Sequence, residues 1–101
     1  MDQVETRRTE ALIRLVADST ARLDERDDAA MDLGASDDPR ARSVLVDIAS
    51  DPASEYILAA SAGESLGEIA TRTGPLTDEE VALLRPDAAA EYRAVGLWRR
   101  R

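Results

Sequence analysis

The chain has no cysteine and no histidine among its 101 residues. Without cysteine, neither a disulfide nor a thiolate metal site can form. Without histidine, the usual general base and the commonest metal ligand are both missing. Carboxylates are left for acid–base chemistry, which needs a cleft and a raised pKa that the sequence does not indicate. We therefore expect a protein without catalytic activity, without a bound metal and without a cofactor.

Basic residues are also few. The 13 basic residues stand against 21 aspartates and glutamates, which gives a formal net charge of −8. Nucleic-acid binding and binding to anionic membranes both depend on basic surface, so this balance disfavours them. No apolar run is long enough to span a bilayer, and the start of the chain lacks the pattern of a signal peptide. We expect a cytoplasmic protein whose acidic surface attracts basic partners.

Strand signals are missing as well, because no segment alternates polar and apolar residues over a sustained run. Helical spacing of apolar residues, together with caps and breakers, predicts six helices instead. The expected ranges are about 3–17, 21–35, 39–49, 52–72, 78–84 and 88–99. The turns between them are expected near Asp18, Ser36, Asp51, Gly74 and Pro86.

Local capping signals support these boundaries. Asp38 and Asp51 are each followed by a proline, so each offers an N-cap carboxylate and a residue suited to the first helical position. Thr77 makes a capping box with the glutamate three residues later. We expect Pro86 to stop the fifth helix and Asp87 to cap the sixth.

Much of the sequence repeats itself. A shift of 33 residues places residues 11–36 on residues 44–69 without a gap, so that Leu33 falls on Leu66. A shift of 36 finds a third, shorter copy. A fixed period of this size is typical of stacked helical repeats. We expect the two leucines to be equivalent buried residues, each beside a glycine that lets neighbouring helices approach closely.

The repeated pattern at residues 29–34 and 62–67, two small residues followed by Leu-Gly, resembles the second helix of HEAT-type repeats. The turn aspartates Asp18 and Asp51 resemble the same family, and Arg26 falls where it usually has an arginine, although Ala59 stands there in the second copy. The resemblance implies an all-α fold: six helices in three antiparallel pairs, stacked as a short right-handed HEAT-like α-solenoid. It also implies a single domain over residues 1–101, with repeats at about 3–36, 38–73 and 77–99.

The expected fourth helix is the most apolar, so we place it in the middle of the stack, with neighbours on both sides. Tyr56, Tyr92 and Trp98 are interpreted as core or capping residues. The three arginines at residues 99–101 are interpreted as complementing the dipole at the end of the last helix.

Carboxylates crowd into the expected second helix, whereas the aligned positions 57–61 of the fourth helix are mostly apolar. Within a stack, this difference indicates that the second helix lies at an exposed edge or lines a groove. A solvated face and a divalent metal site are the alternatives, although the glycine turn of a calcium loop is missing. We interpret seven carboxylates as a partner-binding surface: Asp24, Glu25, Asp27, Asp28, Asp32, Glu64 and Glu68.

Repeat arrays of this kind mostly bind other molecules. HEAT-like hydroxylases hold two irons with His–Glu pairs, so the absence of histidine excludes that activity. We expect a non-catalytic protein-binding module, an acidic immunity protein or antitoxin that neutralises a basic toxin. The alternatives are an accessory or lyase-type HEAT-like subunit that binds a small molecule, as in bilin lyases, and an adaptor in a larger complex.

Overall fold

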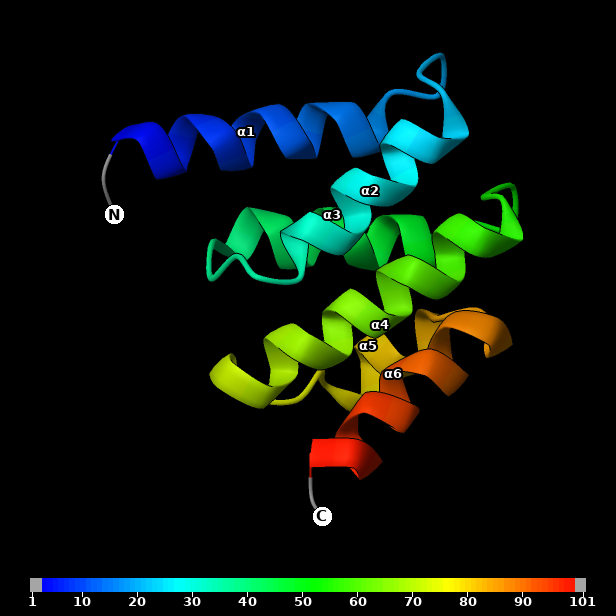
Figure 1. Cartoon of the computed structure of the whole chain (residues 1–101). Helices are drawn as coiled ribbons and strands as arrows, with labels where there is room; N and C mark the ends of the chain where they lie inside the picture. Colours follow the sequence, from blue (N-terminus) through cyan, green and yellow to red (C-terminus); the bar gives the residue numbers. More distant parts are fainter. Residues whose placement is uncertain (1–2, 100–101) are drawn as a thin grey trace.

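All regular structure in the described part of the chain is helical (Figure 1). The computed structural model describes residues 3–99, with side chains as far as Leu97. No strand lies within residues 3–99, so the predicted all-α class and the number of helices are confirmed. The helices are α1 (Gln3–Ala17), α2 (Leu23–Leu33), α3 (Pro39–Ser50), α4 (Tyr56–Thr73), α5 (Asp78–Leu83) and α6 (Pro86–Arg99).

The central helix is α4. It packs against α2, α3 and α6, while α1 packs on α2 and α3, and α5 lies against α3. Figure 1 shows α2, α4 and α6 following one another from top to bottom on the side toward the viewer, with α3 and α5 behind them. The predicted central place of the most apolar helix is confirmed, because only a helix with neighbours on several sides can bury so much of its circumference.

One aliphatic cluster joins the helices from Val16 of α1 to Ala89 of α6. Leu33 and Leu66 are 0% and 1% exposed, which confirms that they are equivalent buried residues. Tyr56, in contrast, is 69% exposed. Its interpretation as a core or capping residue is wrong, because it is the first residue of α4 and projects from the end of that helix.

Tyr92 fits the expected capping role. Its side chain is half-buried, and its hydroxyl accepts a hydrogen bond from the backbone N–H of Leu76 at 2.9 Å. This bond joins α6 to the loop ahead of α5. The side chain of Trp98 and the basic end at residues 99–101 lie outside the side chains that the structure describes.

Glycines set the distance between α4 and α6. A Cβ added at Gly67 would lie 2.7 Å from the Cβ of Val95, and one added at Gly63 would collide with the backbone of Ala88. Between α2 and α4, a Cβ at Gly34 would lie 2.9 Å from the hydroxyl of a serine of α4. The predicted close approach beside each buried leucine is therefore confirmed.

Several predicted boundaries agree with the structure. α1 has the predicted range, and Asp38 caps α3 by accepting from the N–H of Arg40 at 2.9 Å. The capping box is present: the hydroxyl of Thr77 accepts from the N–H of Glu80 at 3.1 Å, and the carboxylate of Glu80 accepts from the N–H of Thr77 at 2.9 Å. α4 ends at Gly74, whose φ of 104° suits glycine.

α4 begins at Tyr56, four residues later than predicted. Asp51 does not cap it. Its carboxylate accepts from the N–H of Ala53 at 2.8 Å, and the hydroxyl of Ser54 donates to the carbonyl of Ile48 at 2.8 Å. These bonds fold residues 51–54 into a turn that closes α3, so the aspartate and its proline end one helix instead of starting the next.

α6 begins at Pro86, two residues earlier than predicted. A proline fits the first helical position, where no N–H donor is needed, so Pro86 starts α6 and does not stop α5. Asp87 lies inside the first turn of α6, where its carboxylate accepts from the N–H of Ala88 at 2.9 Å and from the guanidinium of Arg85 at 2.8 Å.

α2 is shorter than predicted by two residues at each end. One carboxylate oxygen of Asp18 accepts from both the N–H and the hydroxyl of Thr20, at 2.9 and 2.6 Å. These bonds form a separate turn ahead of α2, so the helix starts later than the first capping signal.

Candidate protein-binding surface

Four of the predicted site residues crowd into the first half of α2. Asp24, Glu25 and Asp28 are exposed, and Asp27 is half-buried. Because α2 begins at Leu23, the first two of these carboxylates fall in its first turn. The N-terminal end of a helix dipole favours negative charge, which offsets the repulsion between Asp24 and Asp28 at i,i+4 spacing.

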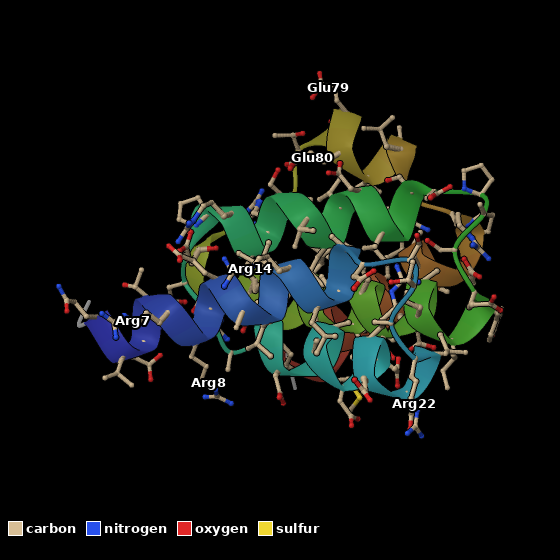
Figure 2. The ribbon with its side chains drawn as sticks, turned by 90° about the horizontal axis from the view of Figure 1, so that it is seen from above. Arg7, Arg8, Arg14, Arg22, Glu79 and Glu80 are labelled. Atoms are coloured by element: carbon tan, nitrogen blue, oxygen red, sulfur yellow. The ribbon has the colours of Figure 1, made fainter. Side chains whose placement is uncertain are left out.

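Arginines of the same chain flank these carboxylates. The guanidinium of Arg22 lies 2.8 Å from Asp24 and 4.0 Å from Glu25, and that of Arg8 on α1 lies 3.9 Å from Asp32. Figure 2 shows Arg8 and Arg22 on the side of the molecule where α2 lies. Exposed pairs of this kind contribute only about 0–1 kcal/mol, so an arginine of a protein partner can compete with them.

Asp27 differs from its neighbours. One of its carboxylate oxygens is shielded from solvent and has no hydrogen-bond partner among the described residues. A shielded polar atom without a partner is unfavourable for folding, because its lost hydration is not replaced.

The predicted residues of α4 share a helix side with those of α2. Glu64 is exposed and Glu68 is half-buried, and the 33-residue shift places Glu64 at the exposed Met31 of α2. Position 31 follows Asp24, Asp27 and Asp28 at i+7, i+4 and i+3, so these positions lie on one side of the helix. Asp32 is turned toward α1 by its pair with Arg8. We use the term acidic face for the carboxylates on the shared side of the two helices: Asp24, Asp27, Asp28, Glu64 and Glu68.

Several arginines donate hydrogen bonds to backbone carbonyls at the C-terminal ends of helices. Arg26 donates two hydrogen bonds to the carbonyl of Val16 in the last turn of α1, at 3.1 and 2.9 Å. Arg72 donates to the carbonyl of Gly34 after α2, at 2.8 Å. The last carbonyls of a helix have no partner within the helix, so a guanidinium both satisfies them and complements the dipole.

The carbonyls after α3 and α4 also accept hydrogen bonds from arginines. Ala59 of α4 aligns with Arg26 of α2, but an alanine side chain has no donor for a carbonyl. Arg85 instead donates to the carbonyl of Ser54 after α3 at 2.6 Å, and Arg42 donates to the carbonyl of Gly74 after α4 at 3.3 Å. No local sequence pattern indicates this use of arginine, because the donors lie 10 to 38 residues from their acceptors.

An open groove runs between the C-terminal halves of α4 and α6, with a volume of about 580 Å³. Several of its lining residues are small, and a Cβ added at Gly96 would meet no atom of the described residues within 4 Å. Leu97, which also lines it, is 67% exposed. In the sequence, the groove is marked at most by a glycine next to a leucine near the end of α6. The lining residues are Gly67, Ala70, Thr71, Pro75, Tyr92, Arg93, Gly96 and Leu97.

Two carboxyl groups that cap helices, both outside the acidic face, have lowered pKa values. The guanidinium of Arg40, and then its backbone N–H, lower the pKa of Asp38. The N–H of Thr77, and then the guanidinium of Arg42, lower the pKa of Glu80. These groups stabilise helix starts.

Among the described residues, no group of three or more His, Cys, Asp or Glu side chains is placed to hold a metal ion. Over the same part of the chain, none of the helices combines the length and the apolar character that crossing a bilayer requires.

The acidic face and the groove adjoin each other. Thr71 lines the groove and lies on the same side of α4 as Glu64 and Glu68, because the three residues follow i, i+4, i+7 spacing. Comparisons with protein-family models, with curated proteins and with solved structures find no match to this chain.

Proposed function

We propose that this chain is a non-catalytic protein-binding module whose acidic face docks a basic protein partner. The six helices form a short HEAT-like α-solenoid of three antiparallel pairs, α1 with α2, α3 with α4, and α5 with α6. The packing of α1 on α2 and of α3 on α4 supports the first two pairs. So does the close approach of the next helix at two glycines one repeat apart, Gly34 and Gly67.

The observation that supports the function most directly is that arginines and carboxylates of this chain make different contacts. Arg26, Arg42, Arg72 and Arg85 each donate to backbone carbonyls at helix ends. Of the carboxylates of the acidic face, in contrast, those of Asp24, Asp28 and Glu64 are exposed on α2 and α4, and the pair of Asp24 with Arg22 is itself exposed. A face of one sign attracts partners of the opposite sign and rejects others, chiefly through the rate of encounter.

Among binding roles, we propose an immunity protein or antitoxin that covers a basic toxin. The net charge of −8 on 101 residues suits this role, since a small acidic protein can cover a basic active site. An adaptor in a larger complex would use the same face. A second candidate, an accessory or lyase-type subunit that holds a small molecule, would use the groove between α4 and α6.

The test begins with capture of the partner from the native host and then measures its association rate at several salt concentrations. Replacing Asp24→Asn and Asp28→Asn together should slow association roughly two- to tenfold at low salt, because steering weakens with charge. Added salt should slow the wild type in the same way.

A matched control removes two charges elsewhere. Asp78→Asn with Glu79→Gln changes the net charge equally on α5, and Figure 2 shows Glu79 on the side opposite Arg8 and Arg22. This control should associate at nearly the wild-type rate. The proposal fails if the α2 variant binds as fast as the wild type, or if the control slows binding equally.

A further inference from the structure

We infer that the groove between α4 and α6 is the anchoring part of the binding surface, and that it takes an amphipathic, basic helix of the partner protein. The apolar residues of that helix enter the groove, and its basic residues face Glu64 and Glu68. This inference rests on the proposed function, because it names the part of the partner that the acidic face and the groove bind together.

The shape of the groove suits apolar side chains. Ala70 and Gly96 lack long side chains, which leaves space between the two helices, and Gly67 and Tyr92 also line this space. Leu97, largely exposed, extends the apolar surface at the rim. Bulky apolar side chains spaced at i, i+3 or i+4, and i+7 on a partner helix match a groove between two helices.

The charges at the two rims are opposite. Glu64 and Glu68 lie beyond the lining on the α4 side, on the same side of the helix as Thr71, whereas the α6 side carries Arg93, the one charged residue among the described lining residues. The basic residues on one flank of a partner helix would be attracted by the glutamates of α4 and repelled by Arg93 of α6. These charges therefore favour the orientation in which the basic flank faces α4. The acidic face then continues from α4 onto α2 and meets further basic residues of the same partner.

The openness of the groove favours a protein segment over a small molecule. Sites for small molecules usually enclose most of the ligand surface. This groove instead lies between two helices that follow one another on one side of the molecule (Figure 1), and its lining runs from the middle of α4 to the turn at Pro75. A helix laid along it would cover the apolar lining while its far side stays in solvent.

The test uses a fluorescein-labelled peptide of about 14 residues, close to four helical turns, built from leucine, alanine and arginine. Its leucines follow the i, i+3, i+4, i+7 pattern. Two further peptides serve as comparisons: one of the same composition in scrambled order, and one with glutamate in place of arginine. Binding is measured by fluorescence anisotropy at low salt.

Three protein variants separate the parts of the surface. Gly96→Leu fills the groove, and the space around that Cβ position lets the variant fold. Glu64→Gln with Glu68→Gln removes the α4 charges. Arg93→Ala removes the cation of the α6 rim.

We expect the patterned basic peptide to bind at least about tenfold more tightly than either comparison peptide, because it alone has both the apolar stripe and the charge. Gly96→Leu should weaken it about tenfold or more with little change in salt dependence. The double glutamine variant should weaken it less and should reduce the salt dependence. Arg93→Ala should leave binding unchanged or strengthen it.

Other occupants of the groove give different results, and each would overturn the inference. A glutamate peptide that binds best, or loss of peptide binding in Arg93→Ala, would assign the groove to an acidic ligand. Dodecanoate that binds in place of the peptide would assign it to a small amphiphile. Self-association of the wild type that Gly96→Leu abolishes would assign it to a second copy of the chain.

The same variants distinguish this inference from the proposed function. If Gly96→Leu binds the natural partner as tightly as the wild type while the Asp24 and Asp28 variant binds more slowly, the groove is not used and the acidic face still docks the partner. If the partner binds without any dependence on salt or on the acidic face, the proposed function fails as well.

Discussion

At the scale of single residues, glycines on α4 determine how closely α4 and α6 pack. Gly63 and Gly67 let α6 approach α4 so closely that a methyl group at either position has no room. Gly96 also lies in a helix, but it faces the open groove. The same residue type therefore has a packing role at two positions and a different role at the third.

This difference predicts opposite effects of the same substitution. Gly63→Ala should lower the free energy of unfolding by about 1–3 kcal/mol, because α6 must move away from α4. Gly96→Ala should raise it by roughly 0.5–1 kcal/mol, because alanine favours the helix and meets no atom. Urea denaturation followed by circular dichroism measures both. A Gly63→Ala protein as stable as the wild type would contradict the close packing of the two helices.

At the scale of helices, the first residue of each helix depends on which group satisfies its backbone donors. Asp38 caps α3 with its own carboxylate, which also accepts from the guanidinium of Arg40 at 2.7 Å. α4 has no such cap, since Glu55 precedes it without a side-chain hydrogen bond. α3 should therefore depend on its cap, while α4 is held mainly by its neighbours.

The cap of α3 predicts a pH effect of definite sign. The folded state lowers the pKa of Asp38 below its usual value of 3.8, so it favours the charged carboxylate. The resulting stability is present above that value and is lost as the pH falls through the folded pKa. Asp38→Ala should cost about 0.5–2 kcal/mol at neutral pH, and this difference from the wild type should shrink in acid.

Unfolding by urea at a series of pH values tests this expectation. Asp38→Asn is the matched control, because asparagine keeps an acceptor for the N–H of Arg40 but does not titrate in this range. Its difference from the wild type should also shrink in acid. A difference between wild type and Asp38→Ala that stays constant down to the lowest pH would show that the carboxylate charge does not contribute.

At the scale of the whole molecule, one apolar cluster joins all of the long helices. Leu66 lies at its centre on α4 and is fully buried, whereas Leu83 at the end of α5 is 63% exposed. α5 has no buried residue of its own and is flanked by the buried Leu76 and Leu84. The cluster should therefore unfold as one unit.

Two leucine substitutions test that expectation. Leu66→Ala should lower the free energy of unfolding by about 2–5 kcal/mol, because it leaves a cavity where α4 meets its neighbours. Leu83→Ala, which removes the same atoms from an exposed site, should change it by at most about 0.5 kcal/mol. Both should show a single denaturation transition. A second transition in Leu66→Ala would indicate that α6 and α1 belong to separate cooperative units.

The sequence by itself determined the helical class, the number of helices, the buried pair Leu33 and Leu66, and the starts of α3 and α5. These features depend on signals within one or two helical turns, such as apolar spacing, a capping aspartate or a capping box. Such signals act before distant parts of the chain meet, so they can be read along the sequence. The HEAT-like pairing and the partner-binding role remain proposals.

Only the tertiary structure decided where α4 begins, which arginines bind the carbonyls at helix ends, and where the groove lies. The turn after α3, for example, is completed by Arg85, which lies 31 residues beyond the Ser54 carbonyl that it holds. The groove likewise depends on lining residues from two helices, such as Ala70 of α4 and Gly96 of α6. Contacts between residues so far apart leave no local pattern, because each partner alone is compatible with many positions in a fold.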